Sequence, residues 1–169
     1  MAAGITSGPR RAVVVGCAAD AGGDEALYFA VVQARLRTCP LIVVATYLRP
    51  VDPDLESFDI PDAVLAEHAH KHAAAALQRV ARRDGQPLPE HRVVTAQGLP
   101  WRVLLHDFPD AGLIVVGAHH RGALRRLLHG QTTAGELVHH SRVPVVVVPS
   151  TPARAEPATG RGMGSALPG

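Results

Sequence analysis

Glycine residues punctuate one connector of the chain in a pattern that suits phosphate binding. The segment 113–150 reads LIVVGAHHRGALRRLLHGQTTAGELVHHSRVPVVVVPS, and Gly117, Gly122 and Gly130 lie between its two apolar runs. Glycine tolerates positive φ and has no Cβ, so backbone N–H groups can turn toward a bound group at close range. A helix beginning after Gly130 would add its positive end to such a site. A turn that holds no ligand is the alternative interpretation, because glycine is common where strands end.

Two apolar runs flank this connector, and both predict strands. Leu113–Val116 and Val143–Val148 are short, rich in β-branched residues and bounded by Gly, Pro and charged residues. Such runs are typical of strands buried on both faces of a parallel sheet. Ligands of open α/β sheets bind at the carboxyl ends of the strands, so a ligand is expected where the first run ends.

The rest of the chain repeats this alternation of strand and helix. Asp24 is a suitable helix cap, and Gly85 is a suitable end for a long Ala-rich helix. Alternating strands and helices imply an α/β fold with three layers, in which an open parallel sheet of five strands carries helices on both faces. The predicted strands are Ala12–Val15, Leu41–Tyr47, Arg92–Ala96, Leu113–Val116 and Val143–Val148, and the predicted helices are Asp24–Arg37, Asp62–Arg83, Trp101–Asp107 and Thr132–His140.

Three histidines, His68, His70 and His72, lie within the long predicted helix. His68 and His72 are four residues apart and share a face, so with a further ligand they could hold a transition metal. No carboxylate or cysteine at ligand spacing completes such a set. We therefore predict a solvated helix face here and no metal site.

Length and composition exclude several classes of protein. The 169 residues suit one domain with a substantial core. A hydrophobic share of 47% with only 4% aromatic residues indicates a core of Val, Leu and Ala. The formal net charge of +2 is small and no basic run is interleaved with aromatic residues, so nucleic acid is not an expected partner. No apolar run approaches the length of a membrane span, so no membrane association is expected either.

Cysteine usage and the first residues favour the cytoplasm. Cys17 and Cys39 are the only cysteines, and their spacing suggests neither a metal site nor a redox pair. Two isolated thiols suit a reducing compartment. The N-terminal MAAGITSGPRR has no apolar signal core. We therefore predict a cytoplasmic protein that is not exported.

The glycine-bearing connector resembles the C-terminal part of the universal stress protein family. Nucleotide-binding members of that family show Gly, two residues, Gly, nine residues, Gly and then Ser or Thr. Gly117 and Gly130 match the first and last glycines with the spacing intact. His120 stands where the family has its second glycine, and Gln131 stands where it has the hydroxyl residue.

The first predicted strand and the following loop resemble the start of the same family, in which a strand precedes Val, Asp, Gly and Ser. Aligned on Val13–Gly16, the acidic residue of the family falls at Ala18 and its serine at Asp20. In nucleotide-binding members the acidic residue helps to hold the nucleoside, a role that Asp20 could take over. The alternative is that Asp20 is an ordinary loop carboxylate. The resemblance covers residues 11–149, and residues 1–10 and 150–169 are predicted to be disordered tails.

This resemblance implies both a fold and a function. The fold would be Rossmann-like, of the adenine nucleotide alpha hydrolase-like kind, with strand order 3-2-1-4-5 and the loops at 16–20 and 117–130 side by side. The function would be that of a non-enzymatic stress-response module that binds an adenine nucleotide, ATP, with no metal beyond a nucleotide-associated Mg. The residues implied to bind the nucleotide are Gly16, Asp20, Thr46, Gly117, His119, His120, Gly130, Gln131 and Thr132.

In that strand order Val143–Val148 lies at an edge of the sheet. Because a β-branched edge invites pairing with another chain, a homodimer through this strand is expected. The alternative function is a dimerising interaction module with a vestigial pocket, which Ala18, His120 and Gln131 favour. An enzyme is not expected, because no Ser/His/Asp set or paired carboxylates can be assembled.

Overall fold

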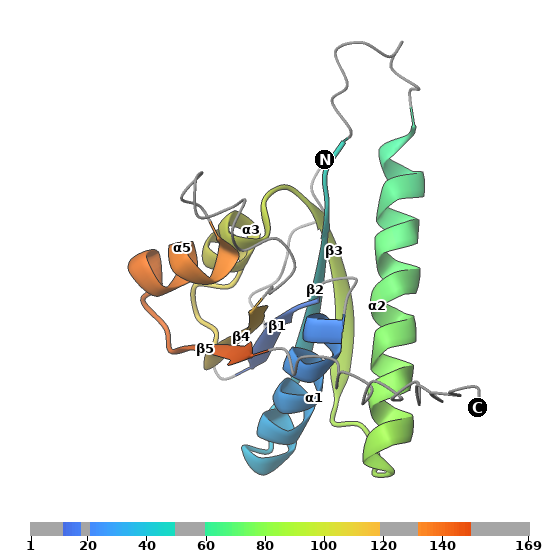
Figure 1. The fold of residues 1–169 in the computed structure, drawn as a ribbon, viewed down its shortest axis with the longest axis vertical. Helices are drawn as coiled ribbons and strands as arrows, with labels where there is room; N and C mark the ends of the chain where they lie inside the picture. Colours follow the sequence, from blue (N-terminus) through green and yellow to red (C-terminus); the bar gives the residue numbers. More distant parts are fainter. Residues whose placement is uncertain (1–11, 18–20, 50–59, 119–131, 150–169) are drawn as a thin grey trace, which may run out of the picture.

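The computed structural model describes residues 12–17, 21–49, 60–118 and 132–149. Strands and helices alternate along these residues, as the sequence predicts (Figure 1). Segments 1–11, 18–20, 50–59, 119–131 and 150–169, which include both predicted tails, lie outside the described residues. The elements are β1 (Val13–Gly16), α1 (Ala21–Leu36), β2 (Leu41–Tyr47), α2 (Asp62–Asp84), β3 (His91–Gln97), α3 (Pro100–Asp107), β4 (Leu113–Ala118), α5 (Thr133–His140) and β5 (Val145–Pro149).

The five described strands form one parallel sheet in the order β3-β2-β1-β4-β5, which confirms the predicted fold. β1 lies at the centre, where Val13 pairs with Leu41 of β2 on one side and with Leu113 of β4 on the other. The chain therefore moves outward from β1 in one direction through β2 and β3, and in the other through β4 and β5. The carboxyl ends of β2, β1 and β4 meet at one edge of the sheet, where the order reverses.

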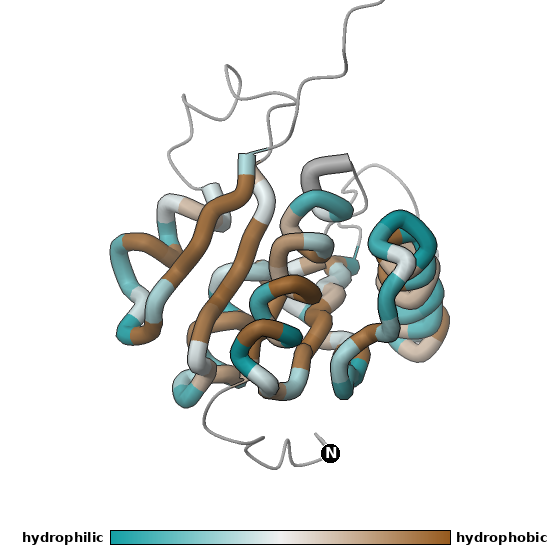
Figure 2. The backbone as a smooth tube through the Cα atoms, turned by 90° about the horizontal axis from the view of Figure 1, so that it is seen from below, coloured by the Kyte–Doolittle hydropathy of each residue, from teal (hydrophilic) through white to brown (hydrophobic). Residues whose placement is uncertain are grey.

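Successive residues of the central strands pack against opposite layers of helices, because side chains alternate across a sheet. Val13 and Val15 pack with α1 and α2, whereas Val14 packs with α3 and α5. In Figure 1 the two helix layers lie on opposite sides of the sheet, and Figure 2 shows hydrophobic residues running along the strands. The burial of both faces explains why these strands are apolar at nearly every position.

Helix ends follow from local residues, with one correction to the sequence prediction. Gly85 ends α2 in the left-handed region with φ 65°, as expected. The prediction that Asp24 caps α1 is wrong, because the helix already begins at Ala21 and Asp24 lies in its first turn. There the carboxylate accepts two hydrogen bonds of 2.8 Å from the Arg79 guanidinium of α2. Asp24 thus joins two helices instead of starting one.

The last strand begins two residues later than predicted. Proline at position 144 has no N–H to donate to a sheet, although its carbonyl accepts a hydrogen bond of 2.9 Å from the Ile114 N–H. Both backbone groups of Val143 bond instead to the Ser141 hydroxyl, at 3.2 Å for the N–H and 2.8 Å for the carbonyl. Within the described sheet β5 is an edge strand, as expected, and β3 is the other edge.

Candidate functional site

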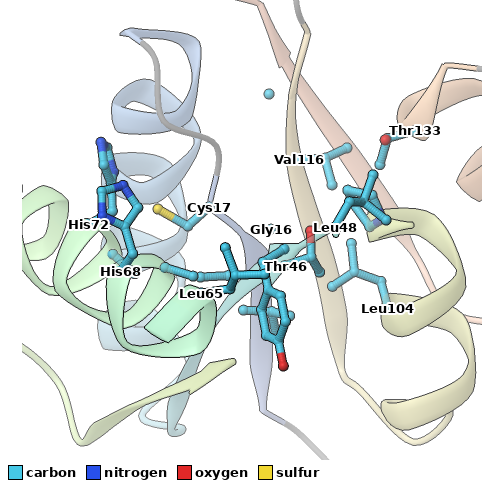
Figure 3. Close-up of a pocket in the computed structure, with 17 residues that line it drawn as sticks. Gly16, Cys17, Thr46, Leu48, Leu65, His68, His72, Leu104, Val116 and Thr133 are labelled. Atoms are coloured by element: carbon cyan, nitrogen blue, oxygen red, sulfur yellow. The ribbon is translucent and has the colours of Figure 1, made fainter. Parts of the chain in front are cut away.

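A cavity of about 440 Å³ lies at the edge of the sheet where β1, β2 and β4 end (Figure 3). Its volume falls within the range of small-molecule sites in proteins, about 300–1,000 Å³. Helices from both layers complete its walls. The described residues that line it are Gly16 at the end of β1 and Cys17 after it, Val44, Ala45, Thr46 and Tyr47 from β2 and Leu48 after it, Leu65, His68, Ala69, His72 and Ala73 from α2, Pro100 and Leu104 from α3, Val116 and Gly117 from β4, and Thr133 from α5.

Gly16 lines the cavity at the end of β1, and close packing leaves little room for a side chain there. A Cβ at this position would lie 3.3 Å from Leu104 Cδ1 and 3.4 Å from Val116 Cγ1. Leu104 is completely buried and Val116 nearly so. Glycine therefore lets the strand end, the adjacent strand and α3 approach one another, and it leaves the backbone of β1 accessible from the cavity.

The N-terminus of α5 adjoins the same edge of the cavity. Thr132 is the N-cap of α5, and its Oγ1 accepts a hydrogen bond of 3.1 Å from the Gly135 N–H. A Cβ at Gly135 would lie only 3.0 Å from that oxygen, so glycine suits the cap. Thr133, the first residue of the helix, lines the cavity. The positive end of the α5 dipole thus lies where an anionic group of a ligand could be held.

Charged side chains of the described residues lie outside the cavity lining. The lining residues given above include no Asp, Glu, Lys or Arg. Nearby, Arg79 bonds to Asp24, and this hydrogen bond raises the pKa of Arg79 above its ordinary value. Arg83 bonds to Glu25 at 2.6 Å, so both arginines serve to join α2 to α1. The described part of the cavity therefore suits apolar and hydrogen-bonding groups more than ion pairing.

The structure brings several of the predicted site residues together. Gly16, Thr46 and Gly117 come from three different strands and line one cavity. Thr132 is exposed at the start of α5, next to the cavity-lining Thr133. The predicted site residues Asp20, His119, His120, Gly130 and Gln131 lie outside the described residues.

Sequence reasoning missed the contribution of α2. His68 and His72 were expected on a solvated helix face; His68 is exposed and His72 half-buried, and both also line the cavity. The five lining residues of α2 recur at helical spacing over 65–73, so they form one face of the helix. The small residues Ala69 and Ala73 on this face were the sequence signal that could have indicated the contribution of α2 to the cavity. Among the described residues no group of three or more His, Cys, Asp and Glu is placed to hold a metal ion.

The chain belongs to the universal stress protein family. A sequence model of that family matches residues 9–149, which is most of the chain and includes every element around the cavity. The resemblance seen in the glycine spacing is thereby confirmed. No curated protein matches the sequence.

Solved structures of universal stress proteins share the fold. One, in complex with cAMP, has 21% sequence identity and a TM-score of 0.57, and the match covers 83% of this chain and 98% of the other. UspA from Lactobacillus plantarum has 21% identity and a TM-score of 0.57, over 82% of this chain and 97% of the other. A family protein from Arabidopsis thaliana with AMP bound has 14% identity and a TM-score of 0.54, over 83% and 92%.

Proposed function

We propose that this protein is a non-catalytic stress-response module that binds an adenine nucleotide in the cavity between β1, β2 and β4. The observation that carries the proposal is the cavity itself, which lies at the switch point of the sheet and contains Gly16 and Gly117 in its lining. Glycines at strand ends permit a phosphate chain to approach the backbone closely. A cavity of about 440 Å³ has room for a nucleotide, whereas a pocket filled by side chains would exclude one.

In the proposed complex the phosphates lie near Gly117 and the first turn of α5. Backbone N–H groups at that helix end and the Thr133 hydroxyl would donate hydrogen bonds to phosphate oxygens. Gln131, Thr132 and His119 are further donors on the same side by their place in the sequence, and Gly130 would permit close approach. Any Mg²⁺ would arrive with the nucleotide, coordinated by its phosphates.

Ligands named for relatives support an adenine nucleotide. The relatives include the cAMP complex, the Arabidopsis thaliana protein with AMP, and an Archaeoglobus fulgidus universal stress protein in complex with dAMP. Thr46, at the end of β2, would then lie near the base, and Asp20 would take over the contact to the nucleoside from the family's acidic residue. ATP is the nucleotide that the glycine motif implies.

A second candidate function is a dimerising module whose pocket is vestigial. Three sequence positions favour it, because Ala18, His120 and Gln131 replace the residues that the family uses on nucleotide. The edge position of β5 favours dimerisation under either function, since Val147 remains 37% exposed there. Light scattering at micromolar concentration should give twice the monomer mass, and a monomer would contradict the dimer.

Isothermal titration with ATP, ADP, AMP and cyclic AMP separates the two functions. The proposed function predicts at least one ligand with a dissociation constant below about 1 mM. A chain that binds none of the four at that concentration would favour the vestigial pocket. The variant His120→Gly tests the same point, because it restores the family's second glycine. It should raise the affinity for ATP.

We place this function in the cytoplasm. Cys17 and Cys39 are the only cysteines of the chain, and two isolated thiols suit a reducing compartment. In the described residues, no helix combines the length and the hydrophobicity that a bilayer crossing requires. A fluorescent fusion followed by cell fractionation tests the location.

A further inference from the structure

The two sides of the cavity offer different chemistry to a ligand. In Figure 3, Thr133 and Val116 lie on one side of Gly16, and His68, His72 and Cys17 lie on the other. The first side presents strand-end backbone and the start of a helix, which suit phosphate. The second side is the α2 face, where two imidazole rings stand beside aliphatic side chains.

Both imidazoles are available to a ligand. The rings of His68 and His72 contact each other, with centroids 6.5 Å apart and planes inclined by 50°. Neither ring makes a hydrogen bond or an ion pair with another described residue. Their charged neighbours on the helix, Glu67 and Lys71, form an ion pair with each other, with Lys71 Nζ 2.7 Å from Glu67 Oε1. A neutral imidazole carries one donor and one acceptor, so the pair can offer both to a ligand edge.

The surroundings of the pair favour a planar ring over a phosphate. Leu65, Ala69 and Ala73 on the same helix face and Ala45 on β2 supply apolar surface on this side of the cavity. A heteroaromatic base has apolar faces and a hydrogen-bonding edge, and it stacks readily on aromatic rings. A phosphate would lose water here without a lysine or arginine among the described lining residues to replace it.

We propose that His68 and His72 recognise the base of the bound nucleotide and so determine which base the cavity accepts. The inference rests on the proposed function and deepens it, because it assigns the base to the α2 side and the phosphates to the α5 side. In this arrangement the base packs against the aliphatic part of the α2 face. The imidazoles hydrogen-bond its edge or stack on its face.

The test compares His68→Ala, His72→Ala and the double variant with His70→Ala. His70 is the matched control, because it lies on the same helix and is exposed like His68 but does not line the cavity. Titration calorimetry with adenosine, AMP and ATP should show an affinity loss of about threefold to tenfold for each single variant, the scale of one hydrogen bond. The loss should be the same factor for all three ligands, and His70→Ala should bind like the unaltered protein.

Other outcomes each have a distinct meaning. A loss that grows from adenosine to ATP would place phosphates at the histidines and overturn the inference. Unchanged affinity in the double variant would overturn it too, while leaving the proposed function intact. If the unaltered protein binds none of the three ligands, the proposed function fails first. Imidazole NMR signals give a second readout, since AMP should shift those of His68 and His72 but not that of His70.

Discussion

On one side of the cavity, Val116 and Leu104 belong both to the lining and to the packed interior, and Gly16 lies close to both. On the α2 side, His68 and His72 belong to the lining but reach solvent. A substitution on the first side therefore disturbs the fold, whereas one on the second side can change the ligand and leave the fold alone. If the proposal for His68 and His72 holds, the α2 side is where this protein's ligand specificity can change at little cost in stability.

Leu104→Ala should produce the largest effect. Leu104 is fully buried between α3 and the sheet and also lines the cavity. Its truncation should lower the free energy of unfolding by about 2–5 kcal/mol. Urea denaturation monitored by circular dichroism measures this loss. Leu36→Ala is the control, because Leu36 is 74% exposed, and a comparable loss there would contradict the account.

Gly16→Val should rank second. The first added carbon already lies 3.3 Å from Leu104 Cδ1, so the branched methyl groups must displace α3 or Val116. Overpacking of this kind costs about 1–3 kcal/mol, and the side chain would also enter the cavity. The melting temperature and the affinity for nucleotide should both fall in Gly16→Val, as thermal unfolding and nucleotide titration measure. Both values for Gly16→Ala should lie between those of Gly16→Val and the unaltered protein. Unaltered nucleotide affinity in a folded Gly16→Val would show that the ligand does not lie over this strand end.

Thr132→Ala should have an intermediate effect that is confined to α5. The variant loses the hydrogen bond from the Gly135 N–H to Thr132 Oγ1, which should cost about 0.5–2 kcal/mol. Thr132→Ser retains the hydroxyl and should restore the stability. Chemical denaturation provides the measurement. Equal stability of the Ala and Ser variants would mean that the cap contributes nothing.

The His68→Ala, His72→Ala double variant should have the smallest effect on stability. Both rings are at least partly exposed and form no hydrogen bond with another described residue, so unfolding should change by less than about 0.5 kcal/mol. Chemical denaturation of the double variant beside His70→Ala measures the change. A loss as large as that of Gly16→Val would remove the contrast between the two sides of the cavity.

Most of the fold could be predicted from the sequence because its signals are local. Apolar β-branched runs specified the strands, and Gly85 specified the end of α2. Errors arose where a local signal had a competing partner. Asp24 has the residue type of a helix cap, but Arg79, distant in the sequence, takes its carboxylate. At Val143 the Ser141 hydroxyl occupies the backbone groups that a longer strand would need.

The candidate site also contains some residues that the sequence predicted and others that it did not. Gly16, Thr46 and Gly117 were predicted from the family resemblance, and they meet because parallel strands bring their carboxyl ends to one edge of the sheet. His68 and His72 could not be predicted, since a helix face with histidines and alanines reads equally well as solvated. Only the packing of α2 against α1, β2 and β3 decides which way that face points.

The sequence by itself determined the layers of this protein, its family and the edge of the sheet at which a ligand would bind. The layers follow from side-chain type and from periodicity, which act over a few residues, whereas the family and its binding edge follow from the resemblance of the glycine spacing. The tertiary structure decided that a cavity remains at that edge and that α2 supplies one of its walls. That outcome depends on how separate elements pack, and no local pattern encodes the space left between them.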